Sequence, residues 1–229
     1  MITRKSGQIR PRIVVYLMGL LIMSLGIVLL IKADLGATPW DVLHVGLYYQ
    51  LGLTIGSWSV LVGFVIIGVA CLISKELPRV GSFTNMILIG LFIDLYLLLP
   101  FMQTPSALIG KMIMFVFGII IYCYGMGIYI SAQFGAGPRD SLMIALTEKT
   151  GWNVGRVRAC MEIVVLIIGW QLGGPVFWGT IVISVTMGSI VGVALPQCQS
   201  LTDWFLQRMK KQDTIIISNL ANEKDRGVN

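Results

Sequence analysis

The sequence is poor in charged residues and in metal-binding side chains. Only 12% of its 229 residues are charged, and it contains one histidine. A typical soluble domain carries about 25% charged residues, so a water-soluble surface is excluded. The four cysteines show no Cys-x-x-Cys spacing, and we expect neither a disulfide nor a metal site from them. They are Cys71, Cys123, Cys160 and Cys198.

Catalytic motifs are also missing. The sequence has no P-loop, no nucleophile with a nearby base and no zinc-ligand set. His44 has no second ligand near it and is expected to be an interfacial residue. We therefore expect no enzyme activity and no cofactor. The net charge of +6 comes from Lys and Arg residues between apolar runs and at the termini, which does not indicate nucleic-acid binding.

Long apolar runs dominate the remaining sequence. Hydrophobic residues make up 56% of the chain, and the mean hydropathy is +0.83. Six segments of about 16 to 20 residues each cover the apolar core of a bilayer as helices, and the first is too long for a signal peptide. The sequence predicts an all-α protein with six transmembrane helices. The segments are Ile13–Ile31, Ser57–Ile73, Phe83–Leu99, Lys111–Ile130, Val157–Leu172 and Val176–Leu195.

Two further segments are too short to span. Pro39–Leu51 and Pro138–Thr150 would each extend about 20 Å as a helix. We expect re-entrant or interfacial helices there. The transmembrane domain is predicted over residues 1–200, and 201–229 form a cytoplasmic tail that starts as a short amphipathic helix and ends disordered.

A repeat with an offset of 99 residues links the two short segments. Leu35-Gly36-Ala37-Thr38-Pro39-Trp40-Asp41 corresponds to Phe134-Gly135-Ala136-Gly137-Pro138-Arg139-Asp140, so both copies read Gly-Ala-x-Pro-x-Asp. Of the 21 positions from 36 to 56, eight are identical in the second copy. Composition alone would give about two. The repeats are predicted at about 13–100 and 111–196.

Three spans in each repeat make the second repeat enter the membrane in the opposite sense. The two repeats are then inverted, as in many secondary transporters. With the N-terminus inside, fifteen of the 17 Lys and Arg residues lie on the inside, and only Lys32 and Lys111 lie outside. This asymmetry predicts cytoplasmic N- and C-termini.

The repeated motif, the Lys32-Ala33-Asp34-Leu35-Gly36 lead-in and the Gly90-Leu91-Phe92-Ile93-Asp94 run resemble the YczE/YitT family of bacterial membrane proteins, most closely its YczE branch. The resemblance covers about residues 13–200. It implies a location in the bacterial plasma (inner) membrane and a function often assumed to be transport. The resemblance supplies no binding residue that can be carried over to this sequence. The two copies of the motif also differ, because Trp40 in the first copy corresponds to Arg139 in the second.

Asp41 and Asp140 are candidate ion-binding residues because they occupy equivalent positions in the two motifs. A structural role is favoured for both. Pro39 and Pro138 suit the first helical position, which places each aspartate three residues into a helix, near its free N–H groups. Thr38 with Asp41 then resembles a capping box.

Two carboxylates lie inside apolar segments, where ionisable groups are costly and often functional. Glu162 follows Arg158 by one helical turn, so an ion pair is the alternative to a functional role. Asp94 has no partner within a turn and is the strongest candidate for a proton or ion site. Arg139 and Arg158 are candidates for binding an anionic solute or lipid headgroups, or simply set the topology.

Two hypotheses of function follow. The first is a small-solute transporter, or a membrane subunit of a larger one, with its site where the two motifs meet. The second is a non-transporting scaffold that binds lipids or a partner protein. The expected partners are the bilayer, a small solute or ion, and a second copy or partner subunit, with no nucleic acid.

Overall fold

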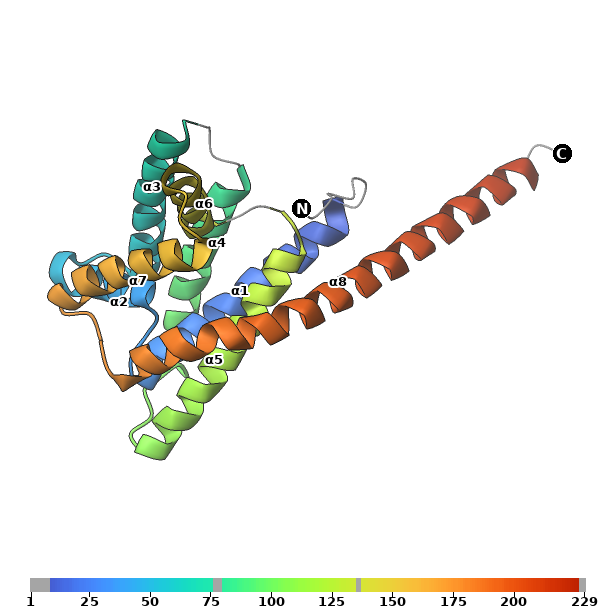
Figure 1. Ribbon diagram of the computed structural model, residues 1–229. Helices are drawn as coiled ribbons and strands as arrows, with labels where there is room; N and C mark the ends of the chain where they lie inside the picture. The colour runs from blue at the N-terminus through green and yellow to red at the C-terminus, as the bar shows by residue number, and fades with distance from the viewer. Residues whose placement is uncertain (1–8, 76–79, 135–136, 227–229) are drawn as a thin grey trace.

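The computed structural model describes residues 9–75, 80–134 and 137–226, and within these ranges the chain is all-α, with eight helices and no strand (Figure 1). The expectation of an all-α protein is confirmed. The helices are α1 (Ile9–Ala33), α2 (Pro39–Leu51), α3 (Ile55–Ser74), α4 (Val80–Leu97), α5 (Leu108–Ser131), α6 (Pro138–Thr150), α7 (Val154–Gln171) and α8 (Trp178–Arg226).

The two short helices have the bounds that the sequence predicts. α2 and α6 each start at a proline, whose missing N–H would have no partner in the first helical turn anyway. Each helix is followed by a glycine with positive φ, Gly52 at 72° and Gly151 at 69°. This backbone conformation is easy only for glycine, and it ends both helices after 13 residues.

Helices α1 and α5 cross at the centre of the molecule with their backbones in direct contact. A Cβ atom on Gly19 would overlap the backbone of Tyr129, and one on Gly118 would press against Leu30. Small residues permit such close approach between apolar helices, where tight packing replaces the hydrophobic effect. Gly19 and Gly118 are 99 residues apart, and so are Leu30 and Tyr129. The two contacts are thus the same contact with the repeats exchanged.

The same reciprocity holds seven residues, or about two turns, further along each helix. Gly26 of α1 faces the backbone of Tyr122, and Gly125 of α5 faces that of Met23. These pairs are again related by 99 residues. The short helices follow the same rule, because α2 packs on α7 of the other repeat and α6 packs on α3.

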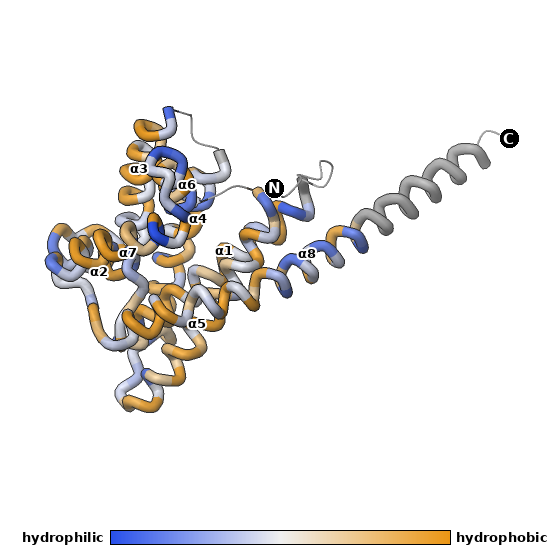
Figure 2. Tube along the Cα trace, in the orientation of Figure 1, coloured by the Kyte–Doolittle hydropathy of each residue, from blue (hydrophilic) through white to orange (hydrophobic). Residues whose placement is uncertain are grey.

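Four helical segments are long and apolar enough to cross a membrane, and Figure 2 shows the apolar residues along them. The six predicted spans all coincide with helices, but α4 and α7 are not among these four segments. The apolar part of α4 is shorter than the four segments, and α7 carries the charged residues Arg156, Arg158 and Glu162 in its first half. Large side chains such as Leu72 (81% exposed) and Leu98 (83%) point outward, as lipid-facing residues do. The four segments are Pro11–Ala33, Ile55–Ser74, Leu108–Ser131 and Trp178–Met209.

The last helix differs from the expectation for the tail. The sequence predicts a span that ends near Leu195, followed by a separate short helix and a disordered end. In the structure α8 is continuous to Arg226, passes through Pro196 and extends well beyond the other helices (Figure 1). A proline in a helix removes one backbone hydrogen bond and crowds the carbonyl four residues earlier. That residue is Gly192, which adds no side chain to the crowding.

Candidate functional site

A cavity of about 410 Å³ lies where the two repeated motifs approach each other. The starts of α2 and α6, the C-terminal half of α5, and parts of α1, α3, α4, α7 and α8 form its wall. Its volume is at the lower end of the range for small-molecule sites, about 300–1,000 Å³. The motifs, which the sequence singles out by their repetition, are therefore brought together around one partly open cavity.

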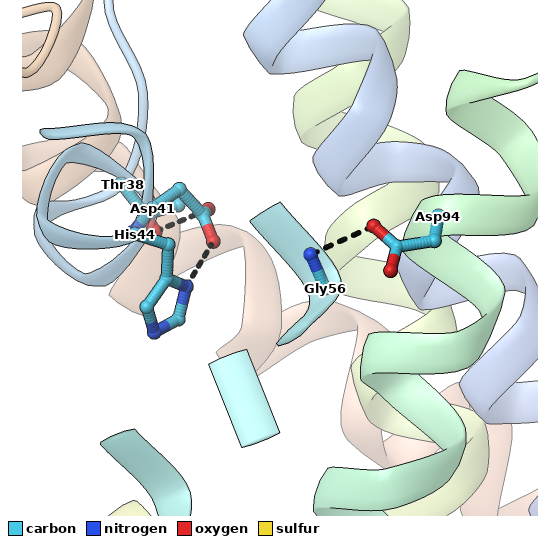
Figure 3. Close-up of polar contacts among 5 residues, drawn as sticks. All are labelled: Thr38, Asp41, His44, Gly56 and Asp94. Carbon is cyan, nitrogen blue, oxygen red and sulfur yellow. Dashed lines mark hydrogen bonds and ion pairs between the residues drawn. The ribbon is translucent and has the colours of Figure 1, made fainter. Parts of the chain in front are cut away.

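Asp41 is not among the residues that line this cavity, and it is almost fully buried, at 1% exposure. Its carboxylate accepts a hydrogen bond from the Thr38 hydroxyl at 2.5 Å, and its N–H donates to the Thr38 oxygen at 3.3 Å. His44 Nδ1 lies 3.8 Å from the same carboxylate (Figure 3). The pairing of Thr38 with Asp41 predicted from the sequence is present, and it closes the start of α2.

Asp140 holds the equivalent position in α6 but lines the cavity. Its N-cap residue is Gly137, which has no side chain to cap the helix as Thr38 does in α2. The Asp140 carboxylate lies beside Gly137 and Tyr129 instead, and it interacts electrostatically with Arg158. The exchange of threonine for glycine between the two motifs thus removes the side-chain cap from the start of α6, where the Asp140 carboxylate lies against the Gly137 backbone.

Arg139 and Trp40 occupy equivalent positions in the two motifs and contact each other. The Arg139 guanidinium lies over the Trp40 ring, 4.7 Å from its centroid, and both line the cavity. Among the described residues, Arg139 has no hydrogen-bond or ion-pair partner. A cation on an indole face is attracted by about 0.5–2 kcal/mol, and its N–H groups at the edge remain available.

Arg158 and Glu162 form the ion pair that their spacing predicts, with Nε and Oε1 at 2.9 Å. Both line the cavity from α7. Their side chains remain 47% and 26% exposed, so the pair lies at the open edge of the cavity and not in its depth.

Asp94 lies outside the cavity lining, and it has partners that the sequence did not reveal. Its carboxylate accepts hydrogen bonds from the Gly56 N–H at 2.8 Å (Figure 3) and from the Thr54 hydroxyl at 2.5 Å. It therefore caps the start of α3 from α4. A carboxylate bonded to helix N–H groups is stabilised there, because it satisfies free donors and the positive end of the helix dipole.

The two ends of the cavity differ. Where α3 meets α4, a Cβ on Gly56 would overlap Gly90, and one on Gly90 would overlap Gly56, so these backbones touch. The repeat equivalents on α7 and α8 are Gly155, at the offset of 99 residues, and Gly188, at an offset of 98, because the repeat slips by one residue before α4 and α8. Both line the cavity, and neither has a residue of the other helix within 4 Å of a Cβ position. The cavity is thus sealed between α3 and α4 and extends between α7 and α8.

The remaining motif residues have structural roles. Gly36 has φ of 114°, and a Cβ there would overlap Thr180. Pro39 and Pro138 line the cavity as the first residues of α2 and α6. Gly135 lies outside the described residues.

Sequence reasoning missed several lining residues. Asn85 is 4% exposed, and its Nδ2 has no hydrogen-bond partner among the residues that the structure describes. A polar amide within the apolar run Phe83–Leu99 was the available signal for it. The tyrosines and methionines gave no such signal, because they are equally common in cores. They are Tyr122, Tyr129, Met23, Met86, Met126, Met143, Met161 and Met187.

Comparison with known proteins places the chain among bacterial membrane proteins. Residues 10–196 match a family described as a "Family of unknown function (DUF6198)". The chain is 43% identical over 195 residues to the "Uncharacterized membrane protein YczE" of Bacillus subtilis, covering 84% of this chain and 89% of that protein. The predicted resemblance to the YczE branch is confirmed.

Two further relatives extend the similarity. An "Uncharacterized protein" of Haemophilus influenzae is 35% identical over 180 residues, which cover 77% of this chain and 80% of the relative. The "Uncharacterized protein YyaS" of B. subtilis is 29% identical over 182 residues, or 79% and 90% of the two chains. No solved structure matches. The chain is thus a multi-pass bacterial membrane protein.

Proposed function

We propose that this chain, which belongs to the family of unknown function DUF6198, is a small-solute transporter whose central cavity opens to one side of the membrane at a time. The observation that carries the proposal is the difference between the two ends of the cavity. The α3–α4 and α7–α8 pairs are equivalent in the repeat, yet one is in contact and the other is apart. Transporters built from inverted repeats alternate between two such arrangements.

The proposed topology has six spans, α1, α3, α4, α5, α7 and α8, with α2 and α6 as re-entrant helices. The reciprocal glycine contacts of α1 and α5 support it, since an axis that exchanges the repeats would produce them. The Lys and Arg distribution supports cytoplasmic N- and C-termini in the plasma membrane. In this orientation the α7–α8 end of the cavity faces the cytoplasm.

The proposed motion brings α7 onto α8 through Gly155 and Gly188 while α3 parts from α4. Asp94 holds the sealed end, because it bonds the start of α3. Its equivalent on α8 is Gly192, so the cytoplasmic end has no corresponding carboxylate. The proposed coupling groups are Asp140 and Glu162, the two carboxylates that line the cavity.

Disulfide cross-linking tests the motion without knowledge of the solute. The four native cysteines are first replaced by serine, and Asn153→Cys and Gly192→Cys are then introduced as the cross-linking pair. These two positions are the repeat equivalents of Thr54 and Asp94, which contact each other at the sealed end. A Cys at 192 has free space around it in the present state. If α7 closes on α8, mild oxidation in native membranes links the two positions, and mass spectrometry detects the joined peptides.

The matched control is Thr54→Cys with Asp94→Cys, whose side chains already meet. This pair should link readily and shows that the oxidation works. If it links while the 153–192 pair never does, the transporter proposal fails. A scaffold that binds lipids or a partner protein is then the better account.

A further inference from the structure

The polar groups of the cavity are unevenly satisfied. Its two carboxylates have partners, since Glu162 is paired with Arg158 and Asp140 lies beside Gly137 and Tyr129. Besides His44 Nδ1, which lies 3.8 Å from the Asp41 carboxylate, two donor groups of the wall lack a hydrogen-bond partner among the described residues. Arg139 makes no hydrogen bond or ion pair within the described ranges, and the Asn85 amide nitrogen has no partner although the residue is 4% exposed. Buried donors are rarely left unpaired, so the cavity is short of an acceptor.

Arg139 and Asn85 both belong to the cavity wall at the start of α6. The Asn85 side-chain oxygen lies 3.2 Å from where a Cβ on Gly137 would stand, so the amide sits at the N-cap of this helix. Arg139 is the second residue of the same helix. The first N–H groups of a helix, together with its dipole, favour an anion. The start of α2 offers no such place, because Thr38 and Asp41 already close it.

The rest of the wall is apolar and adaptable. Six methionines line it, contributed by α1, α4, α5, α6, α7 and α8. Methionine is unbranched and polarisable, and it packs around ligands of different shapes. With a volume of about 410 Å³, the cavity has room for a compact molecule that carries one polar group.

We infer that the cavity binds a small organic anion, with a carboxylate or similar group held by Arg139, Asn85 and the start of α6, and with an apolar body against the methionines. That this anion is also carried across the membrane rests on the proposed function; its binding does not. The guanidinium of Arg139 is planar and lies over the Trp40 ring, and one edge of it can donate two parallel hydrogen bonds to a carboxylate.

Equilibrium dialysis of the purified full chain tests this with three probes of one shape: radiolabelled phenylacetate, phenylacetamide and phenethylamine. We expect phenylacetate to bind and the neutral amide to bind roughly tenfold or more weakly, because only the anion forms charge-assisted bonds. The amine should bind no more tightly than the amide. Absence of phenylacetate binding, or equal binding of the amide, overturns the inference.

Two variants locate the site. Arg139→Gln should weaken phenylacetate binding by roughly tenfold or more. Arg156→Gln is the matched control, since this arginine is exposed, lies two residues before Arg158 and is not part of the cavity wall. Size-exclusion profiles of both variants establish that they are folded. Equal binding by the folded Arg139→Gln variant contradicts the assignment.

A lipid headgroup could offer the same chemistry, so the dialysis is repeated in nanodiscs of phosphatidylcholine with and without phosphatidylglycerol. Unchanged phenylacetate binding supports a soluble anion, and complete displacement by phosphatidylglycerol overturns it in favour of a lipid. If phenylacetate binds but positions 153 and 192 never cross-link, the anion-binding inference stands and the transporter proposal fails. If the two positions cross-link but phenylacetate does not bind, the transporter proposal stands and the anion-binding inference fails.

Discussion

The Arg139 guanidinium lies 4.7 Å from the centre of the Trp40 ring, and the two residues are the same position in the two copies of the repeat. Equivalent residues touch only where the two copies meet. This departure from the repeat therefore sits at the proposed site. Two tryptophans there would supply no charge, and two arginines would repel each other. The unlike pair gives the cavity one cation in a fixed place.

The crossing of α1 and α5 is expected to tolerate no side chain at its glycines. Gly26→Leu should reduce the yield of folded protein sharply or lower its stability by about 1–3 kcal/mol or more, since backbone atoms of Tyr122 occupy the space. The measurement is thermal unfolding of the detergent-solubilised protein by fluorescence. Gly68→Leu on α3 is the control, because nothing lies within 4 Å of its Cβ position. Equal behaviour of the two variants would refute the crossing.

Loss of the Asp94 carboxylate should weaken the sealed end. Asp94→Ala removes two hydrogen bonds to the start of α3, and bonds to charged groups contribute about 1.5–3 kcal/mol each. We expect a lower unfolding temperature for this variant than for Glu148→Ala, an exposed acidic residue of α6 with no hydrogen-bond or ion-pair partner in the described part of the chain. Identical unfolding temperatures would show that the cap contributes nothing to stability.

The Arg158–Glu162 ion pair should contribute little to stability. Because both side chains are partly exposed, a double-mutant cycle with Arg158→Gln and Glu162→Gln is expected to give a coupling energy below about 1 kcal/mol. Salt should reduce it further. A coupling energy of several kcal/mol would mean that the pair is desolvated, which its exposure in this structure contradicts.

The inverted topology predicts opposite sides for two reporter fusions. Alkaline phosphatase fused after Gln103, in the segment between α4 and α5, should be active outside the cytoplasm. Green fluorescent protein fused at residue 229 should fluoresce in the cytoplasm. Activity of the two reporters on the same side would rule out two three-span repeats of opposite sense.

The helices could be predicted largely from local signals. Prolines at positions 39 and 138 and glycines at 52 and 151 set the bounds of the short helices, and hydropathy placed the long ones. Such signals act within a few residues, so they fix helix ends without knowledge of the fold. The bounds of α2 and α6 agree with the prediction for that reason.

The roles of the carboxylates could not be predicted in the same way. The repeat makes Asp41 and Asp140 equivalent, yet a threonine in one motif and a glycine in the other decide which of them reaches the cavity. Asp94 looked isolated because its partners lie 38 and 40 residues away. Contacts across such distances are set by helix packing, which a local pattern does not encode.

The reciprocal crossing of α1 and α5 also bears on how a chain of this kind arises. Each repeat carries both glycines and both surfaces that receive them. A half-length ancestor would therefore already possess everything needed to pair with a second, oppositely inserted molecule of itself. Gene fusion would then have joined two partners that already fitted, and left each copy free to diverge at positions such as 40 and 139.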